Sequence, residues 1–302
     1  MSVIRVLDFE STDDPGPEAG LCELAYTDVV SKSQDLAGEP CNWEVREGKA
    51  RLCSPGFPIP PNTAAVHHIL DEDVVGLPNW QPLLRSLVQS SVAQKGDEKV
   101  IAFGAHGAKM ESAWISSDWY AAGVTPIPFI CTYKTALRVW KDAPLHSNMG
   151  LRYWRRPAGL ERAKGLPAHR AGPDSYVTAH HVRDLLNDGC PLQQMIEWTK
   201  LPALTVRCRL GSARNGGKGT LWEDVDDGLL QWIVSKRDFD DEDVLYTARH
   251  HIAIREEAYR REREEAELNR QLIANGMAPV GVTAAGEAID RVVVDPNQGL
   301  LL

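Results

Sequence analysis

Val3 to Glu10 reads VIRVLDFE, a short apolar run followed by two acids on either side of Phe9. The run predicts a buried strand that ends at the acids. Because side chains alternate along a strand, Asp8 and Glu10 would share one face while Phe9 points to the other. Two carboxylates on one face repel one another unless a cation lies between them. The stretch therefore indicates either a cation site or a solvated strand end.

The residues around this strand predict a mixed sheet. Three strands come first, joined by turns rich in Gly, Pro, Ser and Asp, and helices and strands then alternate. That order favours an α/β sheet whose first strands form an antiparallel meander and whose later strands are parallel. The predicted strands after the first are Leu21–Val30, Asn42–Cys53, Val100–Phe103 and Pro128–Cys131. The predicted helices are Trp80–Val92, Glu111–Ala121, Lys134–Trp140 and Pro173–Asn187.

The character of the chain changes after Pro191. Thr205 to Val234 has a Gly-rich turn and a Trp-rich helical pattern, which predicts a small separate unit. Arg255 to Arg270 is dense in Glu and Arg, as is typical of a solvated helix with ion pairs between successive turns. The predicted division is therefore 1–190, 191–254 and 255–302, the last comprising the charged helix and an irregular tail.

Composition limits the possible functions. A net charge of −9 over 302 residues argues against coating nucleic acid through bulk charge, although local basic patches can still bind it. No run of about 18 apolar residues and no basic leader is present, so we expect no membrane association and a cytoplasmic location. The six cysteines form no CxxC pair, which indicates neither a thiolate zinc site nor a disulfide framework.

Two further stretches carry candidate catalytic groups. His169-Arg-Ala-Gly-Pro-Asp174 puts Asp174 in the first turn of a predicted helix, where the backbone favours a charged carboxylate. His169 precedes it in a loop and is free to face the same way. Ala102 to Ala113, AFGAHGAKMESA, puts His106 at a strand end and Glu111 just beyond it. Taken singly, each pattern also fits an ordinary surface loop.

Taken together and in order, the motifs resemble the DEDDh 3′-5′ exonuclease superfamily, the DnaQ-like group. They are DFE, AVHHIL with DEDV, AHGAKMES, FICTYKTALRVW, HSNMGL and HRAGPD. The resemblance covers roughly Val3 to Leu186, and Arg209 to Val234 looks more loosely like a small C-terminal unit carried by part of that group. It implies a ribonuclease H-like mixed sheet flanked by helices.

The resemblance also implies a site. Asp8, Glu10 and Asp174 would hold one divalent cation, Asp8 would bridge to a second, and Glu111 stands where the family carries an aspartate. His169 would be the general base toward the attacking water, a task that suits an imidazole. Oxygen ligands point to Mg²⁺ or Mn²⁺ and not to zinc.

Candidate substrate contacts come from the motifs and from a basic segment. Phe9, His67 and His106 lie in motifs, but each also fits a core or turn-packing residue. The segment between 152 and 170 is basic and loop-like, and it could follow phosphates while its aromatic side chains stack on bases. A solvated loop is the alternative. The candidates in this segment are Arg152, Tyr153, Trp154, Arg155, Arg156 and Arg170.

The expected function is metal-dependent 3′-5′ exonuclease activity on DNA. The substrate would be single-stranded or frayed ends, and the products nucleoside 5′-monophosphates. Two alternatives remain open: an exoribonuclease, and a nucleic-acid-binding module that kept the fold and lost the chemistry. The sequence leaves the oligomeric state open.

Overall fold

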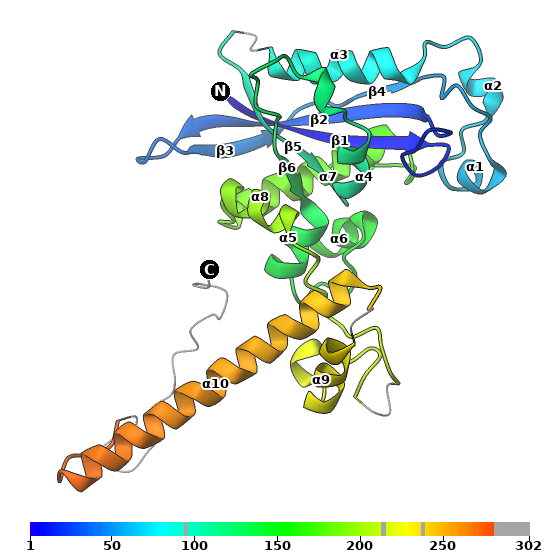
Figure 1. The fold of residues 1–302 in the computed structure, drawn as a ribbon. Helices are drawn as coiled ribbons and strands as arrows, with labels where there is room; N and C mark the ends of the chain where they lie inside the picture. The colour runs from blue at the N-terminus through cyan, green and yellow to red at the C-terminus, as the bar shows by residue number, and fades with distance from the viewer. Residues whose placement is uncertain (94–95, 213–215, 237–238, 281–302) are drawn as a thin grey trace. The chain divides into compact units, whose positions relative to one another are not determined.

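The computed structural model describes residues 1–93, 96–212, 216–236 and 239–280 (Figure 1). The chain divides into two compact units, Met1–Pro202 and Ala203–Leu302. The first unit extends beyond the predicted boundary at 190 because helix α8 (Leu192–Lys200) buries Met195 in its core. Every helix in the described residues is too short or too polar to span a bilayer.

The first unit is built on a mixed sheet with the strand order β3-β2-β1-β5-β6, and β4 also pairs with β2. The strands are β1 (Ser2–Ser11), β2 (Leu21–Gln34), β3 (Pro40–Val45), β4 (Lys49–Leu52), β5 (Lys99–Ala105) and β6 (Phe129–Cys131). β2 pairs antiparallel with β1, β3 and β4, whereas β1, β5 and β6 run parallel. This arrangement confirms the predicted ribonuclease H-like α/β sheet. The predicted third strand is in fact two short strands, β3 and β4.

Helices cover both faces of the sheet. They are α1 (Pro61–His67), α2 (Asp71–Val74), α3 (Trp80–Val92), α4 (Lys109–Ala113), α5 (Thr132–Val139), α6 (Asn148–Arg155), α7 (Ala171–Asn187) and α8. α7 packs Val182 and Leu185 against Ile4 and Val6 of β1, while α3 packs on the opposite face with Leu84 (Figure 1). Burial on both sides explains why β1 is almost continuously apolar before its acids.

Two predicted elements differ in extent. The predicted helix over Glu111–Ala121 is only the short α4, followed by a 3-10 turn, η1 (Ser117–Trp119). Ser116 starts that turn by accepting a hydrogen bond from the Asp118 N–H, which interrupts the helix. Strand β1 does not end at the acids but continues through them to Ser11.

The second unit is a small helical cluster. It contains η3 (Trp222–Asp224), α9 (Asp227–Ser235) and the long α10 (Glu242–Ala274). Trp222, Leu230 and Val244 are buried together in its core. The charged segment predicted from Arg255 to Arg270 is the exposed second half of α10, so no boundary lies at 254. The predicted tail beyond residue 280 lies outside the described residues.

Candidate active site

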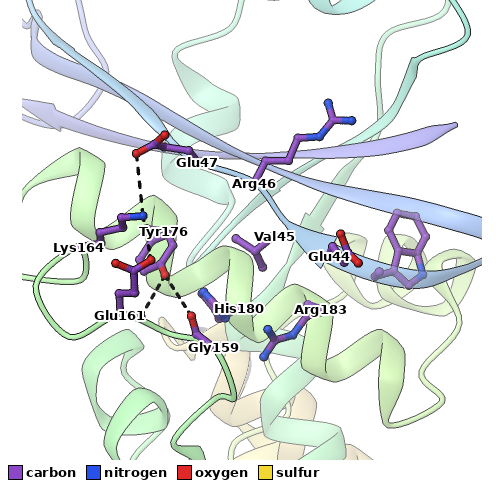
Figure 2. A pocket seen from close by; sticks show the side chains of 11 residues that line it. Glu44, Val45, Arg46, Glu47, Gly159, Glu161, Lys164, Tyr176, His180 and Arg183 are labelled. Carbon is purple, nitrogen blue, oxygen red and sulfur yellow. Dashed lines mark hydrogen bonds and ion pairs between the residues drawn. The ribbon is translucent and has the colours of Figure 1, made fainter.

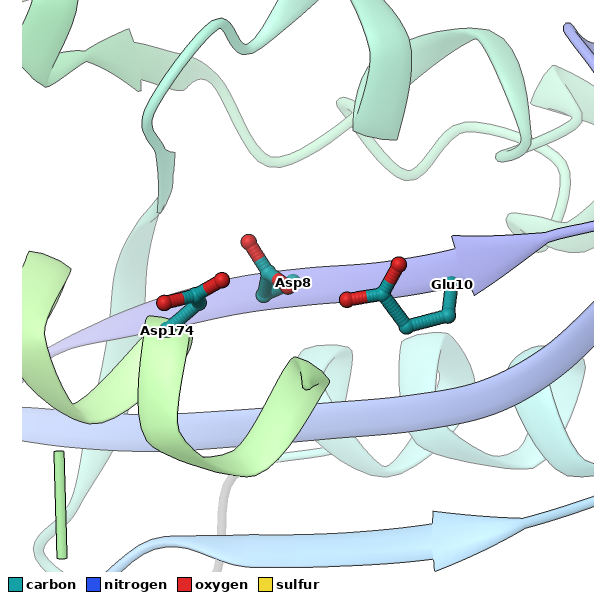
Figure 3. A group of neighbouring side chains, drawn as sticks. All are labelled: Asp8, Glu10 and Asp174. Atoms are coloured by element: carbon teal, nitrogen blue, oxygen red, sulfur yellow. The ribbon is translucent and has the colours of Figure 1, made fainter. Parts of the chain in front are cut away.

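Three carboxylates from distant parts of the chain converge at one end of the sheet. Asp8 and Glu10 project from β1, and Asp174 projects from the first turn of α7 (Figure 3). One oxygen from each carboxylate lies within 4.8 Å of the others, a spacing that a single metal ion could bridge. The cluster forms because α7 packs along β1 and so brings its first turn to the acids. The structure thus brings together three residues predicted from the sequence.

Glu111 is the fourth acid beside this cluster. It lies on α4, directly after β5, the parallel neighbour of β1. Its side chain is 6% exposed, and its Oε2 atom has no hydrogen-bond partner. Its charge contributes to raising the pKa of Asp8, so the two carboxyl groups interact. Within the described residues, however, the carboxylate oxygens that lie within 4.8 Å of one another belong to the other three acids and not to Glu111.

Burial and mutual repulsion disfavour the charged forms of these acids. Burial, then repulsion from neighbouring carboxylates, raises the pKa of Glu10 to about 8 and that of Asp8 well above its usual value. Burial raises the pKa of Glu111 to about 8 and also raises that of Asp174, against the hydrogen bond from the His169 backbone. A divalent cation would remove this penalty.

Unpartnered oxygens support the same interpretation. Asp174 Oδ1 and Glu111 Oε2 are buried without hydrogen-bond partners in the structure. A buried carboxylate oxygen is costly unless a donor or a cation satisfies it. The donor set is made of oxygen atoms alone, which suits hard cations such as Mg²⁺ or Mn²⁺. These residues therefore fit a divalent metal site.

His169 adjoins Asp174 through its backbone. The His169 N–H donates to Asp174 Oδ2 at 2.8 Å, while its own side chain is exposed. Its φ of 58° lies in the left-handed region, which is uncommon for a residue other than glycine and is found at functional sites. The structure thus places the predicted general base next to a predicted metal ligand, with its imidazole accessible.

Two other histidines predicted to contact substrate form hydrogen bonds within the protein instead. His106 Nδ1 lies 2.9 Å from Thr132 Oγ1, and its Nε2 donates to the His146 carbonyl at 2.9 Å. Burial lowers the pKa of His106 to about 3, so the ring is neutral. His67 is 2% exposed, and its Nδ1 accepts from the Ile69 N–H at 3.1 Å. Both histidines fit the structural alternative better than a role in substrate contact.

Phe9 also fits its structural alternative. Its side chain points away from the acids and packs against the cluster that includes Leu21, Leu24 and Trp80. This cluster lies between the sheet and α3. Phe9 therefore helps to hold the strand that carries Asp8 and Glu10.

The basic segment is only partly available to a ligand. Contrary to the prediction of a loop, residues 152–155 form the end of α6. Arg152 is 4% exposed and donates to the carbonyls of Gly165 and Arg162. Its guanidinium is therefore not available to contact a phosphate. Arg155 is partly buried and pairs with Asp188 at 3.1 Å. Side chains at the end of the helix remain exposed: Tyr153, Trp154 and Arg156.

Arg170 has a different partner from the one predicted. Its guanidinium makes two hydrogen bonds of 2.9 Å to the carboxylate of Glu23, on β2. A guanidinium held in this way is not free to follow phosphates. The sequence prediction also missed Glu23, although a single acid within the apolar run LCELA of residues 21–25 is a signal for a buried, paired carboxylate.

A separate pocket lies between β3, the turn after it and α7 (Figure 2). It measures about 320 Å³, and none of the four clustered acids lines it. Its cations Arg46, Lys164 and Arg183 each pair with a carboxylate, which leaves little uncompensated positive charge for a phosphate. His180 lines it with both ring nitrogens unpartnered. The pocket is thus distinct from the acid cluster.

Comparison with known proteins found similar exonucleases. No family model matches the sequence. The chain is 26% identical to exodeoxyribonuclease 10 of Escherichia coli strain K12 over 251 residues, which are 83% of this chain and 99% of that protein. The chain is therefore similar to exodeoxyribonuclease 10 along almost the full length of that protein. The resemblance predicted from the motifs is thereby confirmed. Because the first unit has 202 residues, the likeness to exodeoxyribonuclease 10 must extend into the second.

Solved structures with related folds were also found. One is exonuclease X in complex with 5′ overhanging duplex DNA, with a TM-score of 0.47 and 24% identity over 66% of this chain and 99% of that chain. Another is the nuclease domain of 3′hExo, a DEDDh family member, bound to rAMP, with a TM-score of 0.43 and 15% identity over 62% of this chain and 93% of that chain.

Proposed function

We propose that this protein is a metal-dependent 3′-5′ exodeoxyribonuclease that releases nucleoside 5′-monophosphates from single-stranded or frayed DNA ends. The observation that carries the proposal is the convergence of Asp8, Glu10 and Asp174 within 4.8 Å, beside the buried Glu111. The likeness to exodeoxyribonuclease 10 along most of the chain supports the same enzyme class.

The four acids Asp8, Glu10, Glu111 and Asp174 would hold two divalent cations, Mg²⁺ or Mn²⁺. When bound, such cations lower the pKa of an attacking water and neutralise charge on the phosphate. Holding them requires ionised carboxylates. Burial raises the pKa values of Glu10 and Glu111 to about 8, so ionising these two side chains costs free energy that a bound cation would offset. This supports the proposal.

His169 would take the proton from the attacking water. Its imidazole is exposed to solvent. Its backbone N–H donates to Asp174 Oδ2, which fixes the backbone of the proposed base next to a proposed metal ligand. An imidazole with a pKa near the operating pH is efficient in this role. His169→Ala should reduce the rate without abolishing binding of DNA.

Tyr153, Trp154 and Arg156 are our candidates for holding the strand. They are exposed at the end of α6, where two rings could stack on bases and a guanidinium could meet a phosphate. Stacking tolerates any base, as an exonuclease that digests mixed sequence requires. The proposed preference for DNA over RNA is supported by the similarity to exodeoxyribonuclease 10.

The proposal is tested by identifying the products from matched DNA and RNA oligomers by mass spectrometry. We expect 5′-monophosphates from DNA with Mg²⁺ or Mn²⁺, and none from the Asp8→Ala variant. Asp14→Ala, which removes an exposed acid after β1, is the matched control and should remain active. Faster digestion of RNA would favour the exoribonuclease. Binding of DNA without any release would favour a module that has lost its chemistry.

A further inference from the structure

Glu23 is a buried acid that the proposed chemistry does not use. It is 4% exposed and lies on β2, directly across the antiparallel ladder from Glu10. A buried carboxylate is tolerated only when hydrogen bonds and an opposite charge satisfy it. Since side chains of directly opposed residues lie on the same face, Glu23 also neighbours the acid cluster.

The partners of Glu23 all belong to the segment that begins α7. Arg170 donates from Nε to Oε2 and from Nη2 to Oε1, both at 2.9 Å, a bidentate geometry. The Ala171 N–H donates to Oε2 at 3.0 Å. Ala171 is the first residue of α7, and the first N–H groups of a helix have no partner within it. No side chain at the N-cap residue Arg170 caps α7, and Glu23 of β2 accepts one of these first N–H groups instead.

The same short segment contains His169, the proposed general base, and is hydrogen-bonded to Asp174 of α7. The Asp174 N–H donates to the Arg170 carbonyl at 3.0 Å, and the His169 N–H donates to Asp174 Oδ2 at 2.8 Å. Residues 169 to 171 are thus held on one side by Asp174 and on the other by Glu23. Fixing both sides is consistent with His169 keeping its left-handed backbone conformation.

Arg170 also balances charge. Without it, the Glu23 carboxylate would repel Glu10, its neighbour across the ladder. The Arg170 guanidinium, 2.9 Å from Glu23 Oε2, supplies the opposite charge that compensates this repulsion. The ion pair thus lets a buried carboxylate lie beside a metal ligand.

We propose that Glu23 is a positioning residue, which acts through the Arg170 guanidinium and the Ala171 N–H to fix the start of α7 and with it the His169–Asp174 pair. This inference rests on the proposed exonuclease function for its catalytic consequence. Its structural part, the placement of His169, can be measured whether or not the protein is an exonuclease.

The test compares Glu23→Gln with a matched control, Asp28→Asn. Arg5 and Asp28 also form a bidentate pair between β1 and β2, at 2.8 Å, farther from the acids. Both variants lose one charge from a partly buried arginine pair in the same sheet, so both should lower the melting temperature. Arg170→Lys, which keeps the charge and loses the fork, guards against a Glu23→Gln variant that fails to fold.

Two readouts separate positioning from a general loss of stability. The first is hydrogen exchange of the His169 amide in metal-free protein, followed by NMR. We expect exchange at least about tenfold faster in Glu23→Gln and unchanged in Asp28→Asn. The second is kinetics on single-stranded DNA well below the melting temperature. Loss of such an outer partner typically costs about 10- to 100-fold, and we expect it in kcat with KM little changed, whereas Asp28→Asn stays within about twofold.

Equal exchange of the His169 amide in wild type, Glu23→Gln and Arg170→Lys would overturn the inference. So would a kcat for Glu23→Gln no lower than that of Asp28→Asn. If the wild-type protein released no nucleotide, the proposed function would fail, and the exchange measurement would still decide whether Glu23 positions His169.

Discussion

Glu111 is one of two residues, with Gly107, at which this chain departs from the pattern that its motifs resemble. A glutamate reaches one methylene farther than the expected aspartate, and Mg²⁺ tolerates little deviation from octahedral geometry. The buried, unpartnered Oε2 of Glu111 is consistent with a group that awaits a cation. In the proposed metal site, Glu111 would therefore be a ligand with a longer side chain than the expected aspartate.

Removing the Glu111 carboxylate should strongly reduce activity. We expect Glu111→Ala to lower the rate of nucleotide release by roughly 100-fold, comparable to the loss of a group that stabilises transition-state charge. Glu111→Asp should stay active and show a smaller ratio of Mn²⁺- to Mg²⁺-supported rates than wild type. Steady-state rates with each metal measure both effects, with the exposed Glu18→Ala as control. A fully active Glu111→Ala would exclude a metal role for this residue.

The raised carboxyl pKa values also predict how stability depends on pH. Glu10 and Glu111 have folded-state values near 8, against an ordinary value of 4.5. Between these limits the folded, metal-free protein binds more protons than the unfolded chain, so its free energy of unfolding falls as the pH rises. Thermal melts in chelator should show a melting temperature at least about 5 °C lower at pH 8 than at pH 6.

Divalent metal should reverse this trend, because ions bind the charged carboxylates and stabilise the folded state. A Glu10→Gln, Glu111→Gln variant should show a flatter dependence on pH than wild type. A metal-free protein whose melting temperature rises from pH 6 to pH 8 would contradict the assignment of buried, mutually repelling acids.

At this scale strand alternation and a helix start drew attention to Asp8, Glu10 and Asp174 as local signals, and the resemblance to a known family implied that the three acids form one site. Glu23 was missed because its partner Arg170 lies 147 positions away and only the fold brings them together. Arg152 was wrongly assigned to the substrate because a charged side chain in a basic run suggests solvent. Its partners are backbone carbonyls, which no sequence pattern reveals.

Among the elements, those with strong apolar periodicity were predicted best. α3 has the predicted bounds, Trp80–Val92, since its apolar residues recur at three- and four-residue spacing. Residues 152–155, the second half of α6, were predicted to belong to a loop because the segment 152–170 is basic. The helical form of α6 depends on a tertiary contact, the burial of Leu151 in the main core. Local propensity alone could not show this.

The structure predicts different effects for Arg152, which lies in α6, and for Arg156, which directly follows its last residue. Arg152→Ala should lower the free energy of unfolding by about 2 to 3 kcal/mol, because it removes two hydrogen bonds and leaves the buried Gly165 carbonyl unpaired. Arg156→Gln should leave stability unchanged and reduce the salt dependence of DNA binding by about one unit of slope, as expected for a phosphate contact. Chemical denaturation and fluorescence anisotropy at several salt concentrations measure the two effects. An Arg156 variant with the wild-type slope would remove this residue from the proposed interface.

At the scale of the molecule, the order of the elements predicted the mixed sheet, and the resemblance implied the helices that flank it. The change in sequence character after Pro191 predicted the small C-terminal unit. The internal extents of the units were not, because α8 joins the first unit only through packing and α10 runs through a change in composition. The likeness to exodeoxyribonuclease 10 extends into the second unit, so that unit belongs in any experiment on function.

The central claim is that acids from β1 and α7 form a metal centre that removes nucleotides from 3′ ends. The most direct measurement is a time course on single-stranded DNA labelled at its 5′ end, using the full chain with Mg²⁺ or Mn²⁺, with chelator, and with Asp8→Ala. We predict a ladder of progressively shorter labelled strands with metal, and none with chelator or with the variant. Immediate release of labelled mononucleotide, which marks digestion from the 5′ end, or equal activity of Asp8→Ala would contradict the account.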